Sequence, residues 1–212
     1  VDYIFNVPRF TKKNTMADTK AFLEKLGNPD LGLHIIHVAG TNGKGSVCAY
    51  MRSILETAGK RVAVFTSPHL VDVRERFVID GEMIEKEAFY EAFQIIYNQL
   101  NWEELEAGEG YHPTFFEYMF FIAMLIFRKE MPDYCILETG LGGRLDATNA
   151  VSKKELAVIT RISLEHTEYL GDTIALIAGE KAGIMKENIP VVFADTDEQS
   201  TAVFLEMAKE LS

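Results

Sequence analysis

A glycine-rich segment at residues 40–46, GTNGKGS, is the feature that most constrains how this chain can fold. It follows an apolar run rich in β-branched residues at 33–39 and precedes an amphipathic stretch at 47–58. This order predicts a buried strand, a tight loop and a helix. The free amides and the dipole at the start of such a helix attract anions. We therefore expect a phosphate-binding loop within an α/β fold.

The residue types in this segment support a phosphate site. Its glycines permit a tight path and close approach of a ligand, Lys44 supplies a positive charge, and Ser46 adds a hydroxyl. The spelling departs from the usual Walker A motif, because Gly45 separates Lys44 from Ser46. The alternative is a glycine-rich turn capped by Ser46, but such a turn would not explain why a lysine stands among three glycines. The predicted nucleotide-binding residues are Gly40, Thr41, Asn42, Gly43, Lys44, Gly45, Ser46 and Val47.

Apolar runs and helical patterns alternate along the rest of the chain. Further strand patterns occur at 61–66, 133–138, 156–162 and 190–194, and helical patterns at 86–100, 114–129, 174–185 and 198–211. This alternation predicts a mainly parallel sheet with helices on both faces. Residues 77–81 predict a short extended arm with a turn, and 101–112 a surface loop. Thr114 and Glu117 match a capping box, which is the default role of Glu117. We expect one domain, residues 1–212.

Polar residues lie at or just after the ends of three predicted strands. They are Ser67, Glu138 and His166. Ligands of parallel sheets sit beyond the carboxyl ends of the strands, so these side chains could hold magnesium against nucleotide phosphates. Taken singly, each has a plainer explanation: Ser67 as a turn residue, Glu138 as a solvated strand end, and His166 as a partner of a neighbouring glutamate.

Five stretches of the sequence carry a more specific signal together. They are HVAGTNGKGSV from His37, TSPHL from Thr66, LETGLGGRLDATN from Leu137, ISLEHTEYLGDT from Ile162 and GEKAGIMK from Gly179. In this order they resemble the Mur ligase superfamily and, within it, the folylpolyglutamate synthases and dihydrofolate synthases. Thr139 stands where that family more often has Val, and Glu165 where it more often has Asp. The resemblance implies a P-loop NTPase-like domain of the Mur ligase central type.

The resemblance also implies roles for individual residues. The glycine-rich segment would bind the phosphates of ATP, and Ser67, Glu138 and His166 would surround magnesium, although a nitrogen ligand is unusual for this hard ion. Lys181 resembles the lysine that the family carbamylates to hold a second magnesium ion. The alternative for Lys181 is a lysine on a helix surface that pairs with a nearby acid. The expected catalytic residues are Lys44, Lys181 and His166.

The acceptor substrate is expected beside the loop 68–76. This loop resembles the segment that lies against the pterin-bearing substrate in the family, and its arginines suit carboxylates, although basic residues are common in exposed loops. Asp146 and Asn149 resemble family positions in the same cleft, and Asn149 alternatively forms a local turn. The predicted substrate-binding residues are Pro68, His69, Arg74, Arg76, Asp146 and Asn149.

The activity that the resemblance implies is ATP-dependent amide formation. A folate γ-carboxylate would become an acyl phosphate and then react with L-glutamate, with Lys44 and magnesium spreading the developing charge. Family members continue into a C-terminal α/β domain that contributes to glutamate binding, and no part of this sequence supplies it. We therefore expect the chain alone to be inactive and to bind nucleotide weakly at best.

Three other functions remain open on the sequence. A dihydrofolate synthase, or an enzyme with both activities, shares these motifs. A cell-wall Mur ligase is disfavoured because GTNGKGS followed by TSPHL resembles the folate branch. A nucleotide-binding module without ligase chemistry would have no need of Glu138, His166 and Lys181 together.

Composition limits the expected partners. With 21 Lys and Arg against 32 Asp and Glu, the formal net charge is −11, which argues against a broad nucleic-acid surface. The most apolar run, 119–127, is shorter than the roughly 20 residues that span a bilayer. Cys48 and Cys135 lie in apolar stretches and predict buried thiols in a reducing compartment. We expect a cytoplasmic protein, monomeric when intact, that binds ATP, a reduced folate or dihydropteroate, and L-glutamate, but neither nucleic acid nor membrane.

Overall fold

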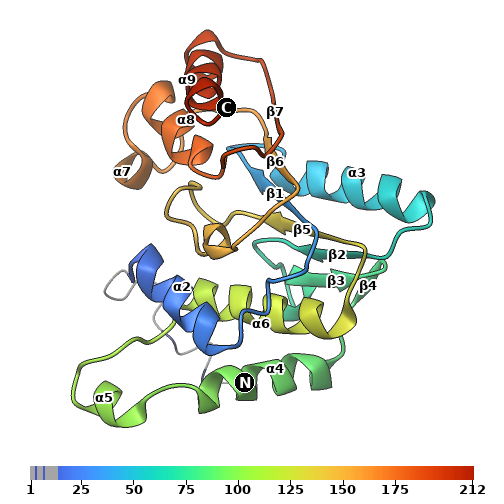
Figure 1. Ribbon diagram of the computed structural model, residues 1–212, viewed down its shortest axis with the longest axis vertical. Helices are drawn as coiled ribbons and strands as arrows, with labels where there is room; N and C mark the ends of the chain where they lie inside the picture. Colours follow the sequence, from blue (N-terminus) through green and yellow to red (C-terminus); the bar gives the residue numbers. More distant parts are fainter. Residues whose placement is uncertain (1–2, 4–6, 8–13) are drawn as a thin grey trace.

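In the computed structural model, which describes Tyr3, Val7 and residues 14–212, five apolar runs form the parallel part of a seven-stranded sheet. The strand order is β4-β3-β2-β5-β1-β6-β7 (Figure 1). The strands are β1 (Ile35–Ala39), β2 (Val62–Phe65), β3 (Phe77–Ile79), β4 (Glu82–Met83), β5 (Tyr134–Glu138), β6 (Leu156–Ile159) and β7 (Val191–Phe193).

Strand pairing confirms the mainly parallel sheet that the sequence predicts. β2, β5, β1, β6 and β7 pair in parallel, whereas β3 and β4 form an antiparallel arm on β2. The turn of this arm contains Asp80 and Gly81, both with positive φ. The register places Val38 beside Glu138 and Ala39 beside Ile159, so β1, β5 and β6 end at the same edge of the sheet.

Helices cover both faces of the sheet, as expected. On one face, α3 (Lys44–Thr57) packs Cys48 against alternate strand residues such as Val38 and Val64. The opposite face is covered by α2 (Met16–Lys25), α4 (Lys86–Asn98), α6 (Phe115–Glu130), α8 (Ile174–Ala182) and α9 (Glu198–Glu210). Side chains that alternate along a strand point to opposite faces, so both layers bury apolar residues of the same strands.

α6 is the central helix of the larger core. Its residues from Tyr118 to Met124 are all fully buried, which is the pattern of a helix enclosed on every side. It lies between the sheet and α4 (Figure 1). Fully burying each of its larger apolar side chains contributes about 1.5–3 kcal/mol. The Thr114–Glu117 capping box that begins this helix is confirmed.

Three local predictions were wrong or incomplete. Part of the expected loop 101–112 forms α5 (Trp102–Glu106), because the Asn101 side chain accepts the Glu104 amide and caps it. α2 was not predicted, since its few apolar residues give a weak pattern, although Thr15 and Asp18 form a capping box there. α3 begins at Lys44, before the expected 47–58 stretch. A further short helix, α7 (Thr167–Leu170), follows β6.

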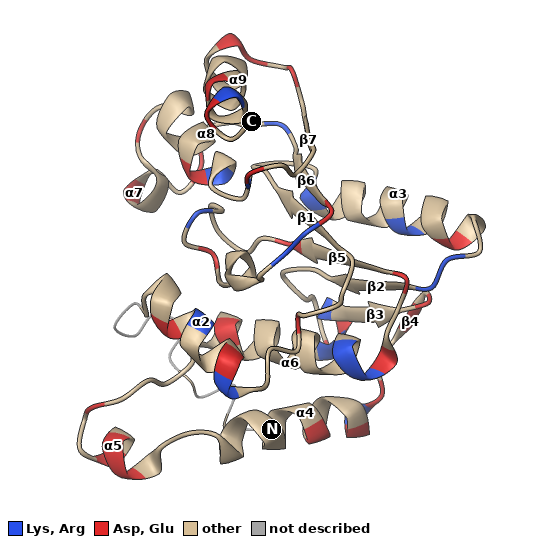
Figure 2. Ribbon diagram, viewed as in Figure 1, with Lys and Arg blue, Asp and Glu red and all other residues tan. Residues whose placement is uncertain are grey.

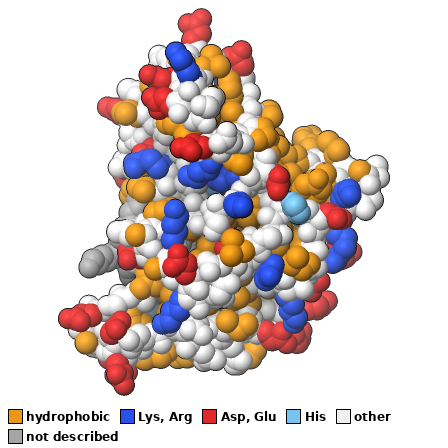
Figure 3. Space-filling view, in the orientation of Figure 1, with side chains coloured by type: hydrophobic (Ala, Val, Ile, Leu, Met, Phe, Trp, Pro, Cys, Tyr) orange, Lys and Arg blue, Asp and Glu red, His pale blue; other side chains and the backbone are white. Residues whose placement is uncertain are grey.

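The surface carries both charged and apolar side chains. Acidic residues lie along α4, α5 and α9 (Figure 2). Hydrophobic side chains gather over α3, where Tyr50 and Ile54 are largely exposed (Figure 3). Both cysteines, Cys48 and Cys135, are buried free thiols, as predicted. Within the described residues, no helix combines the length and apolar character needed to cross a bilayer.

Candidate nucleotide-binding site

The glycine-rich segment joins the end of β1 to the start of α3. Gly43 caps α3 in the left-handed conformation, with φ 87°, and no side chain of the described residues caps the first turn. Gly43, Gly45 and Ser46 are exposed, so the amides of that turn face solvent. Together with the helix dipole they form an anion site. Ser46 lies inside the first turn, so the alternative of a turn capped by Ser46 is wrong.

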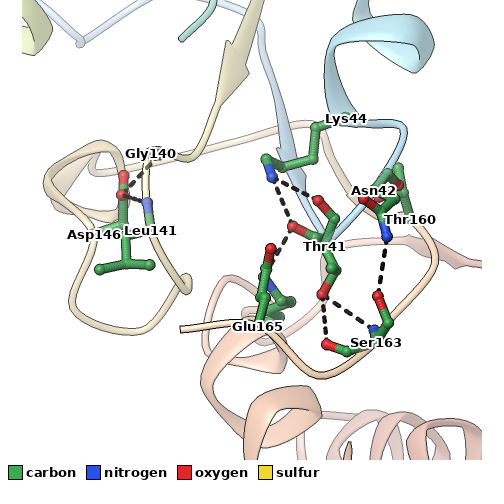
Figure 4. A network of polar contacts seen from close by, with 11 residues as sticks. Thr41, Asn42, Lys44, Gly140, Leu141, Asp146, Thr160, Ser163 and Glu165 are labelled. Carbon is green, nitrogen blue, oxygen red and sulfur yellow. Dashed lines mark hydrogen bonds and ion pairs between the residues drawn. The ribbon is translucent and has the colours of Figure 1, made fainter. Parts of the chain in front are cut away.

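The shape of this segment depends on residues that follow β6. Gly40 has φ 146°, and a Cβ there would lie 1.8 Å from Thr160 Oγ1. The Thr160 hydroxyl donates to the Asn42 carbonyl at 2.9 Å. Thr41 donates to the Ser163 carbonyl at 3.1 Å, and the Asn42 amide donates to the Ser163 hydroxyl at 3.0 Å (Figure 4). Only glycine can stand at position 40 without displacing this support.

Two lysines converge on the segment. Lys44 Nζ donates to the carbonyls of Gly40 at 2.8 Å and Thr41 at 3.2 Å (Figure 4). Lys181 Nζ, from α8, donates to the same Gly40 carbonyl at 2.9 Å and pairs with Glu165 at 2.7 Å. The Lys181 side chain is only 1% exposed, so the alternative of a surface lysine is wrong, whereas its pairing with an acid is present. Burial lowers the pKa of Lys181, and the charge of Glu165 opposes that shift.

Glu138 and Ser67 meet at neighbouring strand ends. Glu138 ends β5, is 4% exposed, and accepts the Ser67 amide at 3.1 Å. A Cβ on Gly45 would lie 3.9 Å from Glu138 Oε2, so this carboxylate reaches the first turn of α3. Burial raises the pKa of Glu138, against the lowering effects of the Ser67 amide and of Lys44. A carboxylate and a hydroxyl beside an anion site are oxygen donors of the kind that magnesium prefers.

His166 lies on the surface, just after β6. It is exposed, adopts φ 44° and precedes α7, and within the described residues its ring makes no hydrogen bond. No group of three or more His, Cys, Asp or Glu in the described part of the chain is placed to hold a metal ion. The role of His166 as a ligand stays a prediction.

The two arginines of the acceptor loop have different surroundings. Arg74 pairs with Asp72 at 2.9 Å and borders a cavity of about 610 Å³ between this loop and the start of α4. Arg76 is buried, donates to His69 Nδ1 at 2.9 Å and lies over the Phe115 ring at 5.5 Å. Substrate binding by Pro68, His69, Arg74 and Arg76 stays a prediction. Pro68 follows Ser67 through a cis peptide bond.

Asp146 and Asn149 hold the loop that follows Glu138. Asp146 accepts the amides of Gly140 at 2.8 Å and Leu141 at 2.9 Å (Figure 4). Asn149 donates to the carbonyls of Arg144 and Gly183, each at 3.1 Å. These contacts are structural, beyond the local turn considered for Asn149, and substrate contact by either residue stays a prediction.

Several residues of the site were missed by sequence reasoning. Thr160 and Ser163 support the glycine-rich segment, and Phe116 packs so closely on Gly140 that a Cβ there would lie 2.6 Å from its ring. Glu117 does more than cap α6, because it also accepts hydrogen bonds from Asn14 and Thr19. Two adjacent phenylalanines at a helix start were the available signal for the Phe116 contact.

The chain is similar to known proteins in sequence and in fold. No family model matches the chain. It is 46% identical over 180 residues to folylpolyglutamate synthase of Arabidopsis thaliana, which covers 85% of this chain and 31% of that protein. It is 42% identical over 198 residues to dihydrofolate synthase/folylpolyglutamate synthase of Bacillus subtilis, covering 92% and 45%. A solved structure described as an FPGS-AMPPCP-folate complex matches 99% of this chain with a TM-score of 0.91 and 34% identity.

The chain spans less than half the length of these two curated relatives and 51% of the solved chain. Within that span, the agreement in sequence extends over at least 85% of the present chain, and the folds agree over nearly all of it. In sequence and in fold, the chain belongs to the folylpolyglutamate synthase and dihydrofolate synthase family.

Proposed function

We propose that this chain binds MgATP and serves as the ATP-binding part of an amide ligase that joins L-glutamate to the γ-carboxylate of a folate. The observation that carries this proposal is the placement of Lys44, Glu138 and Ser67 around the amide-rich start of α3. A matched structure is described as a complex with AMPPCP, an ATP analogue, and folate. A glutamate-binding domain outside this chain would complete the active site.

The side chains present can position and neutralise the reactants. The first-turn amides of α3 and Lys44 would bind the phosphates, while an oxygen of the folate γ-carboxylate attacks the γ-phosphorus and ADP departs. The amine of glutamate then attacks the acyl carbon, and inorganic phosphate leaves. Magnesium, which Glu138 and Ser67 would hold, supplies neutralisation of phosphate charge. The protein needs no covalent nucleophile for either step.

Lys181 is proposed to act as a carbamate that holds a second magnesium ion. Its burial and lowered pKa support this, because only the neutral amine adds carbon dioxide. The ion pair with Glu165 would have to open in the modified form. Intact mass measured in bicarbonate buffer should show the mass of one added carbon dioxide, absent from Lys181→Arg. An unchanged mass would remove the carbamate from the proposal.

The deciding experiment is ADP formation by the intact protein that contains this chain, with MgATP and L-glutamate. Tetrahydrofolate and dihydropteroate are offered separately. Turnover with tetrahydrofolate supports a folylpolyglutamate synthase, and turnover with both supports the second candidate, a bifunctional enzyme such as the Bacillus subtilis relative is named for. Silence with both acceptors would reject the ligase proposal. Steady glutamate-dependent ADP release by the 212-residue chain alone would reject the need for a further domain.

Glu138→Gln is expected to raise the magnesium concentration needed for half-maximal nucleotide binding by about 10- to 100-fold. The substitution keeps the size of the side chain but removes the charge that faces the start of α3. In the unchanged protein, magnesium affinity should fall as pH drops through the raised pKa of Glu138, because protonation removes the same charge. Glu155→Gln, an exposed site before β6, is the control. An unaltered magnesium requirement in Glu138→Gln would exclude Glu138 as the ligand.

The proposed setting is the cytoplasm, with small molecules as the partners of a monomer. Two buried free thiols fit a reducing compartment.

A further inference from the structure

Lys154 is a buried lysine outside the proposed nucleotide site. It lies between the 3₁₀ turn η2 (Ala147–Ala150) and β6, and it is 4% exposed. Its ammonium donates to three acceptors: His37 Nδ1 at 2.7 Å, Asn149 Oδ1 at 3.2 Å and the Ile184 carbonyl at 3.0 Å. Three donors thus meet three acceptors, none of which carries a negative charge.

The hydrogen bonds continue from His37 toward the loop after Glu138. His37, fully buried in β1, contacts Thr148 Oγ1 through Nε2 at 2.8 Å, and the Thr148 hydroxyl donates to Asp146 Oδ1. Asp146 Oδ2 in turn accepts the amides of Gly140 and Leu141. We call Lys154, His37, Thr148 and Asp146 the Lys154 relay.

With Lys154 as the ammonium and Asp146 as the carboxylate, the chemistry of the groups fixes the direction of every bond in the relay. A carboxylate only accepts, so the single Thr148 proton goes to Asp146, and Thr148 Oγ1 must accept from His37 Nε2–H. An ammonium only donates, so His37 Nδ1 accepts from Lys154. His37 is therefore a neutral ring with its proton on Nε2. This agrees with its pKa, which burial and then the charge of Lys154 lower well below the usual range.

The relay connects two buried charges of opposite sign. Within the described residues, no carboxylate lies within 4 Å of Lys154 Nζ, so Asp146 compensates its charge only through His37 and Thr148. Burial, and then Lys186, lower the pKa of Lys154 to about 7. Burial also raises the pKa of Asp146, while its hydrogen bonds with Thr148 oppose the shift. Cutting the relay would remove the hydrogen-bonded connection between these two opposite charges, and a buried charge without its counter-charge is costly.

We propose that Lys154 is a positioning residue that fixes the loop 139–146 through His37, Thr148 and Asp146. The loop begins directly after Glu138, and the β1–β5 register places His37 beside Leu137, one residue before it. Through Asp146, the relay therefore holds the backbone amides of Gly140 and Leu141 in place, two and three residues after the proposed magnesium ligand Glu138. Its effect on nucleotide binding rests on the proposed function, whereas its effect on the loop does not.

The unmodified chain provides the first test. A two-bond nitrogen–proton correlation spectrum at neutral pH should show His37 as the neutral Nε2–H tautomer. A proton on Nδ1, or an imidazolium, would overturn the relay. This measurement needs no variant.

Amide exchange in two variants provides the second test. Lys154→Met keeps the length of the side chain and removes its charge, and exchange at Gly140 and Leu141 should become at least about ten-fold faster. Lys153→Met, at the adjacent exposed lysine, is the matched control and should leave exchange unchanged. Thr148→Val removes the hydroxyl that links His37 to Asp146, and it should likewise speed exchange at Gly140 and Leu141. If Lys154→Met fails to fold, this variant provides the test. Unchanged exchange at both amides would overturn the proposal.

Titration with the ATP analogue AMPPCP and magnesium separates this proposal from the proposed function. If the unmodified chain binds the analogue, Lys154→Met should bind it several-fold more weakly than Lys153→Met does, and equal affinity of the two variants would overturn the positioning role. If the unmodified chain does not bind it, faster exchange in Lys154→Met still establishes the positioning of the loop, while the ATP-binding proposal fails.

Discussion

Replacing Lys44 with alanine is expected to reduce ADP formation by the intact enzyme on the order of 10³-fold, with the fold retained. Lys44 supplies a positive charge beside the proposed phosphate site, and alanine would leave only the amides of α3 and the magnesium ion to neutralise the transferred phosphoryl group. The fold should persist because, among the described residues, the ammonium bonds to the carbonyls of Gly40 and Thr41, and the Gly40 carbonyl keeps its bond from Lys181. Steady-state kinetics with saturating nucleotide measure the loss of ADP formation, and the thermal unfolding midpoint shows whether the fold is retained.

The control for this substitution is Lys60→Ala, at an exposed lysine just beyond the other end of α3. It removes the same charge from the protein but none from the site, so activity should stay near that of the unmodified enzyme. Equal activity of Lys44→Ala and Lys60→Ala would exclude Lys44 from the mechanism. Loss of activity together with loss of the folded state would show that Lys44 acts through the structure of the loop.

Gly40→Ala should lower the free energy of unfolding by about 2–6 kcal/mol, through backbone strain of about 1–3 kcal/mol and overpacking of a similar size. The new methyl group would meet Thr160 Oγ1 at 1.8 Å, and the backbone at Gly40 has φ 146°. The loop can relieve the clash only by moving away from Thr160, which breaks the bond from Thr160 to the Asn42 carbonyl. Denaturant unfolding of the 212-residue chain measures the effect.

Gly59→Ala separates the clash from the strain. Gly59 also has a positive φ, 76°, but a Cβ there would meet nothing within 4 Å. Its cost should therefore be only the strain of about 1–2 kcal/mol. Adding Thr160→Ala to Gly40→Ala should recover part of the loss by removing the nearest atom. Equal costs at Gly40 and Gly59 would show that the contact with Thr160 is relaxed in solution.

The framework of the fold was predictable because it depends on short, local patterns. The runs 33–39, 61–66 and 133–138 were predicted as buried strands, and each contains the observed strand with a residue or two to spare. α2 and α5 escaped prediction because each is defined by a capping side chain, Thr15 or Asn101, more than by an apolar stripe. A cap is a single contact, and a single contact is a weak signal in a sequence.

The placement of two candidate site residues could be predicted from the sequence, although their roles stay predictions. Lys44 and Glu138 were identified because a loop after β1 and the end of β5 must share one edge of a parallel sheet. Lys154 and His37 were not, because they are 117 residues apart and only the packed fold brings them together. The pairing of Arg74 with Asp72, two residues away, was equally hidden by the assumption that an arginine in a loop faces a ligand.

The contacts beneath the glycine-rich segment make the phosphate motif a poor candidate for transplantation. Its seven residues owe their course to Thr160, Ser163 and Lys181, which are 118 to 141 positions away. Grafted into another scaffold, the same residues would lack the Thr160 hydroxyl and the Lys181 ammonium that donate to their carbonyls. They would also lack the Ser163 oxygens that accept from Thr41 and Asn42. The structural unit is therefore the loop after β1 together with the residues that follow β6. A substitution in either part would alter the shape of the phosphate site.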